Sequence, residues 1–185
     1  DNLQISTYSA TDCAVEITQN DTSICFGDSI EVSLSQNCIN DSQEFDFIGE
    51  YNGSEYYMTD SKYNFSEALD FSSFYNVDLL TITSSDENTF VSELIQTNIN
   101  NSYVWLGASD ENSEGSWYWI NGENWNYSNW DNGEPNNQVG GEDFCELRPN
   151  SKWNDIPATT SENLYVVLEN TEECANDYLW STGET

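Results

Sequence analysis

The sequence predicts an α+β fold in which two helices pack against antiparallel β-sheets and one long loop connects two of the strands. Three observations support this prediction. Several segments alternate apolar and polar residues or form short apolar runs, as half-buried and buried strands do. Two other segments place apolar residues on one helical face and begin at capping residues. The length of 185 residues suits one principal domain with additional structure at its ends.

The predicted strands begin with a β-hairpin. Phe45–Tyr51 and Glu55–Thr59 are joined by Asn52–Gly53, a dipeptide that strongly favours a two-residue hairpin turn. The later strands are expected at Asp78–Ile82, Tyr103–Gly107, Phe144–Leu147 and Leu164–Leu168.

Two helices are predicted between these strands, each beginning at a capping residue. Asn64 caps the first helix and Glu67 follows three residues later, which is the spacing of a capping box. Ser84 and Glu87 have the same spacing at the start of the second helix. The side chains expected to face the core are Phe65, Ala68, Leu69 and Ser72 in the first helix and Phe90, Val91, Leu94 and Ile95 in the second. We expect both helices to contribute packing and no chemistry.

A long loop at residues 108–141 is rich in Asn, Ser, Gly and Trp. Loops of this length without regular structure are usually functional or disordered. The tryptophans within it, Trp117, Trp119, Trp125 and Trp130, indicate that this loop is packed against the body of the domain.

The charge balance is extreme, with 34 acidic residues against three basic ones and a formal net charge of −31. This balance argues against partners such as nucleic acids and anionic membranes, since binding either requires Lys and Arg to neutralise phosphates. It fits a salty, calcium-containing medium in which screening and bound cations relieve the self-repulsion. No apolar run approaches the roughly 18–20 residues of a membrane-spanning helix. Because Asp1 opens no signal-peptide pattern, we expect a segment of a processed or larger protein.

The stretch Gly133–Asp155 carries acidic and amide side chains on segments interrupted by glycines and a proline. Calcium takes about six to eight oxygen ligands and tolerates irregular geometry. The candidate ligands are Glu134, Asn136, Glu142, Asn154 and Asp155. Three of these five are anionic at pH 7, so gathering them is strongly unfavourable unless a cation is bound. A cis peptide at Glu134–Pro135 would direct the flanking side chains at one ion, while the alternative is an ordinary acidic surface loop.

These motifs resemble the C-type lectin-like domain family, whose calcium site uses a Glu-Pro-Asn in a long loop, a Glu shortly before a strand and a Trp-Asn-Asp in the following strand. All three occur here in that order, at 134–136, 142 and 153–155. Further similar motifs are Trp105–Gly107, Glu114–Trp117 and Asn129–Trp130. The resemblance covers about residues 45–169 and implies a C-type lectin-like fold with a long calcium-binding loop. At these positions tryptophans are expected to be internal anchors, although exposed ones would be able to stack on sugar rings.

The resemblance also implies calcium-dependent carbohydrate binding, in which two neighbouring sugar hydroxyls coordinate the ion and bond to its ligands. The main calcium and carbohydrate site carries over as Glu134, Asn136, Glu142, Asn154 and Asp155. The order acid-Pro-amide is that of members favouring mannose, fucose, glucose or N-acetylglucosamine, whereas Gln-Pro-Asp indicates galactose. A second calcium position carries over as Asp110, Glu114, Asn137 and Asp143. We expect it to be weaker because Asn137 replaces an acid.

The family's usual disulfides are missing from the body of the domain. Ser72 and Leu168 occupy the positions of one of the family's cysteine pairs, and Phe144 and Ala158 occupy those of the other. At the second pair, a large residue facing a small one would fill the space of the disulfide. Cys145 follows Phe144 and is expected to point to the other face of its strand, as a buried and unreactive free thiol.

Four further cysteines lie outside the body, Cys13, Cys25, Cys38 and Cys174, and they allow three pairings. The termini of the family's fold lie close together, which favours Cys38 with Cys174 and leaves Cys13 with Cys25. Disulfides imply an oxidising, exported location.

The flanks at 1–44 and 170–185 are expected to be β-rich. Val15–Ile17 and Ile30–Leu34 alternate apolar and polar residues. Both flanks resemble immunoglobulin-like repeats in large surface proteins of gliding and marine bacteria, which implies a bacterial, marine, extracellular adhesin that displays the domain at 45–169. The alternative is a set of accessory strands on the lectin fold.

Two other classes of function remain. A calcium-supported module binding proteins or ice would use the same loop surface, since a fold does not fix the ligand. A glycoside hydrolase would use paired carboxylates, but a bound ion lowers the pKa that a catalytic acid needs raised. The chain has no histidine, which excludes a His-based triad and a His-ligated zinc site. We therefore expect no enzymatic activity.

Overall fold

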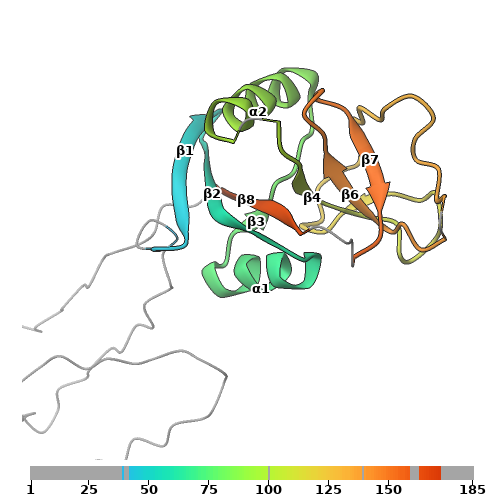
Figure 1. Cartoon of the computed structure of the whole chain (residues 1–185), viewed down its shortest axis with the longest axis horizontal. Helices are drawn as coiled ribbons and strands as arrows, with labels where there is room; N and C mark the ends of the chain where they lie inside the picture. The colour runs from blue at the N-terminus through green and yellow to red at the C-terminus, as the bar shows by residue number, and fades with distance from the viewer. Residues whose placement is uncertain (1–38, 40–41, 100, 139, 159–162, 172–185) are drawn as a thin grey trace, which may run out of the picture. The chain divides into compact units, whose positions relative to one another are not determined.

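The computed structural model describes residues 39, 42–99, 101–138, 140–158 and 163–171 (Figure 1). These residues belong to one compact unit, Asn37–Glu173. Within them the chain forms two helices and a sheet of eight strands, so the predicted α+β class is confirmed. The candidate strands Val15–Ile17 and Ile30–Leu34 and the four flanking cysteines lie outside the described residues, and their predictions stay untested.

The sheet has the strand order β1-β2-β8-β4-β6-β7, with β3 paired to β8 and β5 paired to β4. Its strands are β1 (Phe45–Tyr51), β2 (Ser54–Tyr63), β3 (Asp78–Leu79), β4 (Val104–Ser109), β5 (Tyr118–Trp119), β6 (Phe144–Leu147), β7 (Trp153–Ile156) and β8 (Leu164–Asn170). The expectation of purely antiparallel sheets is wrong at one place, because β4 pairs with β8 in parallel through Val104 and Tyr165. The sheet is therefore mixed.

The predicted hairpin is confirmed, with β1 at the expected bounds. Asn52 and Gly53 have φ angles of 52° and 91°, the left-handed conformations that a tight hairpin turn requires. β2 continues well beyond the expected Thr59. β1 bulges near Gly49, where a Cβ atom would lie 2.9 Å from the Leu94 side chain, so glycine permits the second helix to approach the strand.

Helix α1 spans Phe65–Tyr75 and begins with the complete capping box that its sequence predicts. The Glu67 backbone N–H donates to Asn64 Oδ1 at 3.0 Å, and the Asn64 N–H donates to Glu67 Oε2 at 2.8 Å. The two helices lie on opposite sides of the sheet in Figure 1.

Helix α2 spans Ser85–Asn98, and its predicted capping box is only half correct. The Glu87 N–H donates to Ser84 Oγ at 3.2 Å, as expected. The Glu87 carboxylate instead accepts from the Thr83 N–H at 2.7 Å and from the Tyr56 hydroxyl at 3.0 Å. A hydroxyl from a strand far away in sequence therefore competes for this carboxylate. Neither described helix is long and apolar enough to cross a membrane.

The predicted strand Asp78–Ile82 is shorter than expected, because β3 ends at Leu79. Leu80 is nevertheless fully buried, its N–H donates to Val167 O at 3.0 Å, and its carbonyl accepts from Gly107 N–H at 2.8 Å. Strands β4 and β8 extend two residues past their expected ends. The expected strand at β6 has the predicted bounds.

The two residues expected to fill the space of one missing disulfide, Phe144 and Ala158, both lie against the core. Phe144 and Ala158 both pack against the core cluster that contains Phe65 and Trp105, and the Phe144 and Phe65 rings lie 4.1 Å apart between centroids. Cys145 is fully buried in the other core cluster and is a free thiol. Burial raises its pKa well above the ordinary value, so the predicted buried thiol is confirmed.

Candidate calcium and carbohydrate site

The long loop is packed against β7 by its tryptophans, which confirms that they are internal anchors. Trp119 is buried, and its ring centroid lies 4.7 Å from that of Trp125 and 5.7 Å from that of Trp153 in β7. The Trp117 and Trp130 rings lie 4.7 Å apart. This aromatic packing fixes the loop beside the β6–β7 hairpin, at the end of the unit remote from β1 (Figure 1).

Backbone hydrogen bonds continue this attachment up to the Glu-Pro-Asn turn. The Trp153 N–H donates to Asn129 O at 3.0 Å, and the Asp131 N–H donates to Trp153 O at 2.8 Å. The Glu134 N–H then donates to Asp131 O at 3.1 Å. The predicted cis peptide at Glu134–Pro135 is present.

Asp155 of β7 connects the strand to the turn. It is 1% exposed, and its two carboxylate oxygens accept from the Asn136 N–H at 3.1 and 2.9 Å. The Asn137 N–H donates to Asp155 Oδ2 at 2.6 Å. The turn and strand that the sequence singled out separately therefore meet at one carboxylate.

Two further predicted ligands belong to the same group of contacts. The Asn136 side-chain amide donates to the Glu134 carboxylate. The Glu142 carboxylate accepts from the Gln138 N–H at 2.6 Å, and its own N–H donates to Asn137 Oδ1 at 3.2 Å. Four of the five candidate ligands are thus joined directly or through Asn137.

Asn154 is the fifth candidate ligand, and its amide nitrogen bonds to Glu146 and not to the other four candidates. Its Nδ2 donates to Glu146 Oε1 at 3.0 Å, across the β6–β7 pair. Both residues are 7% exposed. Within the described part of the loop and sheet, no hydrogen bond joins the Asn154 side chain to the other four candidates.

The candidate second calcium position adjoins the first, because Asn137 contacts residues of both. The Asn137 side-chain amide donates to the Glu114 carboxylate. Asp110 is 1% exposed, its Oδ2 accepts from the Gly115 N–H at 2.7 Å, and its N–H donates to Asp143 O at 3.1 Å. Asp110 Oδ1 is buried and has no hydrogen-bond partner.

Three acids of the two positions, Glu134, Asp110 and Glu114, have a raised pKa. Burial raises the pKa of Glu134, and the charges of Asp155 and Glu142 raise it further. Burial also raises the pKa of Asp110, with added effects from the charges of Asp143 and Asp155. Glu114 is exposed, and its pKa is raised by residual desolvation and then by Asp110, Asp143 and Asp155. A bound cation would offset the repulsion among these neighbouring carboxylates.

The donor set fits a hard cation, although the side chains are not converged on one point. Among the described residues, no three His, Cys, Asp or Glu side chains lie together closely enough to hold a metal ion. Their oxygens are instead turned toward backbone N–H and side-chain amide groups, as at Asp155 and Glu142. Calcium prefers oxygen ligands, and the carboxylates and amides of this site provide them. One of these oxygens, Asp110 Oδ1, is buried and has no hydrogen-bond partner.

Sequence reasoning missed the residues that support these candidates. Arg148 lies between Asp131, Glu134 and Glu146, with nitrogen–oxygen distances of 3.2, 3.7 and 3.2 Å respectively. Burial raises the pKa of Glu146, and a hydrogen bond from the Asn150 amide is the main cause that lowers the pKa of Asp131. The one available signal was that Arg148 is among only three basic residues in the chain.

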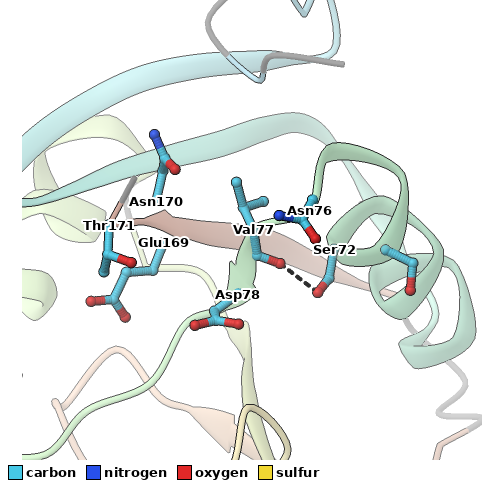
Figure 2. A pocket seen from close by; sticks show the side chains of 8 residues that line it. Ser72, Asn76, Val77, Asp78, Glu169, Asn170 and Thr171 are labelled. Carbon is cyan, nitrogen blue, oxygen red and sulfur yellow. Dashed lines mark hydrogen bonds between the residues drawn. The ribbon is translucent and has the colours of Figure 1, made fainter. Parts of the chain in front are cut away.

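A separate polar pocket of about 320 Å³ lies where α1, β3 and the end of β8 meet. Figure 2 shows Asn76, Asp78, Glu169 and Thr171 around it, and the Ser72 hydroxyl donating to the Val77 carbonyl. No candidate calcium ligand lines this pocket. The candidate site is therefore a surface of the loop and β7 and is distinct from this pocket.

The family model described as "Lectin C-type domain" matches residues 61–166. The chain therefore belongs to the C-type lectin domain family, and the predicted fold is confirmed. Proteins of this family bind carbohydrate, usually with calcium, and are not enzymes. The related proteins are extracellular or on the cell surface.

Among known proteins, the chain is similar to the human CD209 antigen, with 31% identity over 130 residues, which is 69% of this chain and 31% of CD209. The chain thus spans about a third of that relative's length. Two solved structures share the fold. A cow CD23 carbohydrate-recognition domain, crystallised in the presence of a GlcNAc2Man3 oligosaccharide, has a TM-score of 0.61, 24% identity and coverage of 72% of this chain and 97% of CD23's. The herring type II antifreeze protein has a TM-score of 0.60, 20% identity and coverage of 71% and 98%.

Proposed function

We propose that this chain binds carbohydrate through a calcium ion held by Glu134, Asn136, Glu142, Asn154 and Asp155. The observation that carries the proposal is the pair of N–H donations from Asn136 and Asn137 to Asp155, which brings the cis Glu-Pro-Asn turn against β7. Membership of the C-type lectin domain family supports it independently. A bound calcium would coordinate two neighbouring hydroxyls of the sugar.

The side chains around the ion would also form hydrogen bonds with those hydroxyls. A hydroxyl donates to a carboxylate and accepts from an amide. Glu134 with Asn136, and Glu142 with Asn154, would provide two such acid–amide pairs. The order acid-Pro-amide supports a mannose, fucose or glucose type of specificity with vicinal hydroxyls, as equatorial 3- and 4-OH groups provide.

A second calcium ion would use Asp110, Glu114, Asn137 and Asp143. The buried, unpartnered Asp110 Oδ1 supports this assignment. Because Asn137 brings no charge, we propose that this position is the weaker of the two.

The proposed setting is that of a ligand-binding module in a large extracellular adhesin. A single site contacting few groups of a solvated sugar binds weakly, and display in many copies raises the avidity. In that arrangement residues 45–169 are the lectin domain, 1–44 and 170–185 are the flanks, and Cys38–Cys174 and Cys13–Cys25 are disulfides. The relatives named above are from animals, so a bacterial and marine source rests on the flank resemblance and the charge alone.

A glycan array probed with the full chain in calcium, and then in EDTA, tests the proposal. We expect signals on mannose-, fucose- or glucose-terminated glycans that EDTA removes. No calcium-dependent signal would overturn the carbohydrate assignment, and a galactose-only signal would overturn the specificity. Calcium binding by calorimetry without any glycan signal would favour the alternative, a calcium-supported protein- or ice-binding module.

A further inference from the structure

Every ion pair within the described residues is made by Arg148. Its Nη1 lies 3.2 Å from Asp131 Oδ2, its Nη2 lies 3.7 Å from Glu134 Oε1, and its Nε lies 3.2 Å from Glu146 Oε1. The Arg148 side chain is 28% exposed, and those of Glu134 and Glu146 are 11% and 9% exposed. Pairs so shielded from water are stronger than ordinary surface pairs.

Two of these carboxylates lead to proposed calcium ligands. Glu134 is itself a proposed ligand, and Glu146 contacts another, since its Oε1 accepts from Asn154 Nδ2 at 3.0 Å. An ionised carboxylate only accepts hydrogen bonds, so Glu146 takes the NH2 end of the Asn154 amide. The Asn154 Oδ1 is thereby turned away from Glu146, as a ligand atom must be. Arg148 thus contacts Glu134 of one proposed acid–amide pair directly, and it is connected to Asn154 of the other pair through Glu146.

The third carboxylate attaches Arg148 to the loop. Asp131 Oδ2 accepts from Arg148 Nη1 at 3.2 Å and from Asn150 Nδ2 at 3.0 Å. The Asp131 backbone bonds to Trp153 on one side and to Glu134 on the other. The planar guanidinium therefore joins the loop before the Glu-Pro-Asn turn to the turn between β6 and β7, which a single-point ammonium cannot do equally well.

We propose that Arg148 is a positioning residue for the calcium site, which orients Glu134 directly and Asn154 through Glu146. This inference rests on the proposed function. The positive charge of Arg148 and its orienting contacts have opposite effects on calcium binding. Charge repulsion at a partly exposed position is worth up to about fivefold in affinity, whereas loss of a partner that orients ligands typically costs about 10–100-fold. Removing Arg148 should therefore weaken calcium binding despite making the site more negative.

Calorimetric calcium titrations of the full chain test the sign of this effect. Arg148→Ala should weaken calcium binding by about tenfold or more. Arg148→Lys should restore part of the affinity, because an ammonium can still pair with one of the carboxylates but cannot make the three-way fork. The matched control is Lys152→Ala, which removes the same charge from the same turn, where Lys152 Nζ donates to Asn129 Oδ1 at 2.6 Å. We expect Lys152→Ala to change calcium affinity by less than about threefold.

Terbium luminescence provides a readout that general destabilisation would not move. The luminescence lifetime of bound Tb³⁺ reports how many waters complete its coordination shell, and each lost protein ligand should be replaced by about one water. At saturating Tb³⁺, Arg148→Ala should therefore bind more waters than the wild type or Lys152→Ala. Should Arg148→Ala fail to fold by circular dichroism, Arg148→Lys is compared with the wild type in both measurements, and weaker binding with added water is again expected.

The outcomes separate the two proposals. If the wild type binds calcium and Arg148→Ala binds it equally or more tightly than Lys152→Ala, the positioning role is wrong and the charge dominates. If Arg148→Ala has to be set aside and Arg148→Lys matches the wild type in affinity and bound water, the positioning role is likewise wrong. If the wild type binds no calcium, the proposed function and this inference fail together.

Discussion

The Asp155 carboxylate accepts two contacts from the Asn136 backbone N–H, at 3.1 Å to Oδ1 and 2.9 Å to Oδ2. One side chain of a buried strand thereby orients the turn that carries Glu134 and Asn136. Asp155 consequently has two separable roles, organising the turn through N–H groups and contributing negative charge to the proposed ion site.

Asp155→Asn should damage both roles without changing the size of the side chain. The new NH2 group would face N–H donors, so we expect the free energy of unfolding in EDTA to fall by about 1–3 kcal/mol. Calcium affinity should fall by at least about tenfold, because a ligand and a charge are lost. Urea denaturation and calorimetry measure the two effects, with the exposed Asp60→Asn as the matched control. Unchanged calcium affinity in Asp155→Asn would remove it from the ligand set.

Chelation should lower the melting temperature, because the acids gathered near Glu134 and Asp110 repel one another when no cation is bound. A ligand at 100 times its Kd stabilises the folded state by about 2.7 kcal/mol, which corresponds to about 5–10 °C for a domain of this size. Melting curves in calcium, in EDTA and in magnesium measure it. Magnesium should stabilise less, since it requires stricter geometry and retains its waters. A curve that EDTA leaves unchanged would contradict the proposed site.

Glu169 should make stability depend on pH outside the calcium site. It is 7% exposed, and burial, together with the charge of Glu87, raises its pKa from 4.5 to about 7. The folded state therefore holds this proton more tightly than the unfolded state. Stability from Glu169 is fully present below pH 4.5 and is lost as the pH rises through about 7.

Glu169→Gln tests that dependence, since glutamine retains the shape and cannot ionise. Between pH 5 and 8 the wild type should lose about 2–3 kcal/mol of unfolding free energy that Glu169→Gln does not lose. Urea denaturation in EDTA across this range provides the comparison, and the exposed Glu93→Gln serves as the control. Parallel pH profiles for the wild type and Glu169→Gln would show that Glu169 ionises normally.

Local signals predicted much of this fold, and long-range contacts account for the errors. The Asn52–Gly53 turn and the Asn64 cap depend on neighbouring residues, and both were predicted correctly. The second capping box is incomplete because the Glu87 carboxylate accepts from the Thr83 N–H and from Tyr56, which is 31 residues away. The parallel pairing of β4 with β8 likewise has no signature in either strand alone.

In the candidate site, too, the local motifs are predictable from the sequence and the long-range contacts are not. The turn 134–136 and the strand 153–155 were recognised as motifs, and the structure joins them at Asp155. Arg148 was not recognised as part of the site, because its partners Asp131 and Glu134 precede it by 17 and 14 residues and only the folded loop brings them together. A motif identifies ligand types, whereas the groups that orient them depend on tertiary structure.

Exchanging acid and amide in the turn should alter sugar preference while retaining the ion. Glu134→Gln combined with Asn136→Asp keeps the net charge and the number of oxygen donors, so calcium affinity should stay within about threefold. The order of hydrogen-bond acceptor and donor facing the sugar is reversed, which should weaken mannose-type binding and shift preference toward galactose. Competition with mannose and galactose, both in calcium, measures the preference. Wild-type mannose binding by the double variant would show that these two side chains do not read the sugar.

The five cysteines should divide into one buried thiol and two disulfides. Cys145 is fully buried, and burial raises its pKa, so a thiol reagent at pH 8 should leave the folded chain unmodified. Unfolding in urea without reductant should expose about one thiol if Cys38–Cys174 and Cys13–Cys25 are both bridged, and reduction should then expose all five. Cys145→Ser provides the control, since it should show no thiol before reduction. Three or five reactive thiols in unreduced, unfolded protein would mean that at least one of the two proposed bridges is absent.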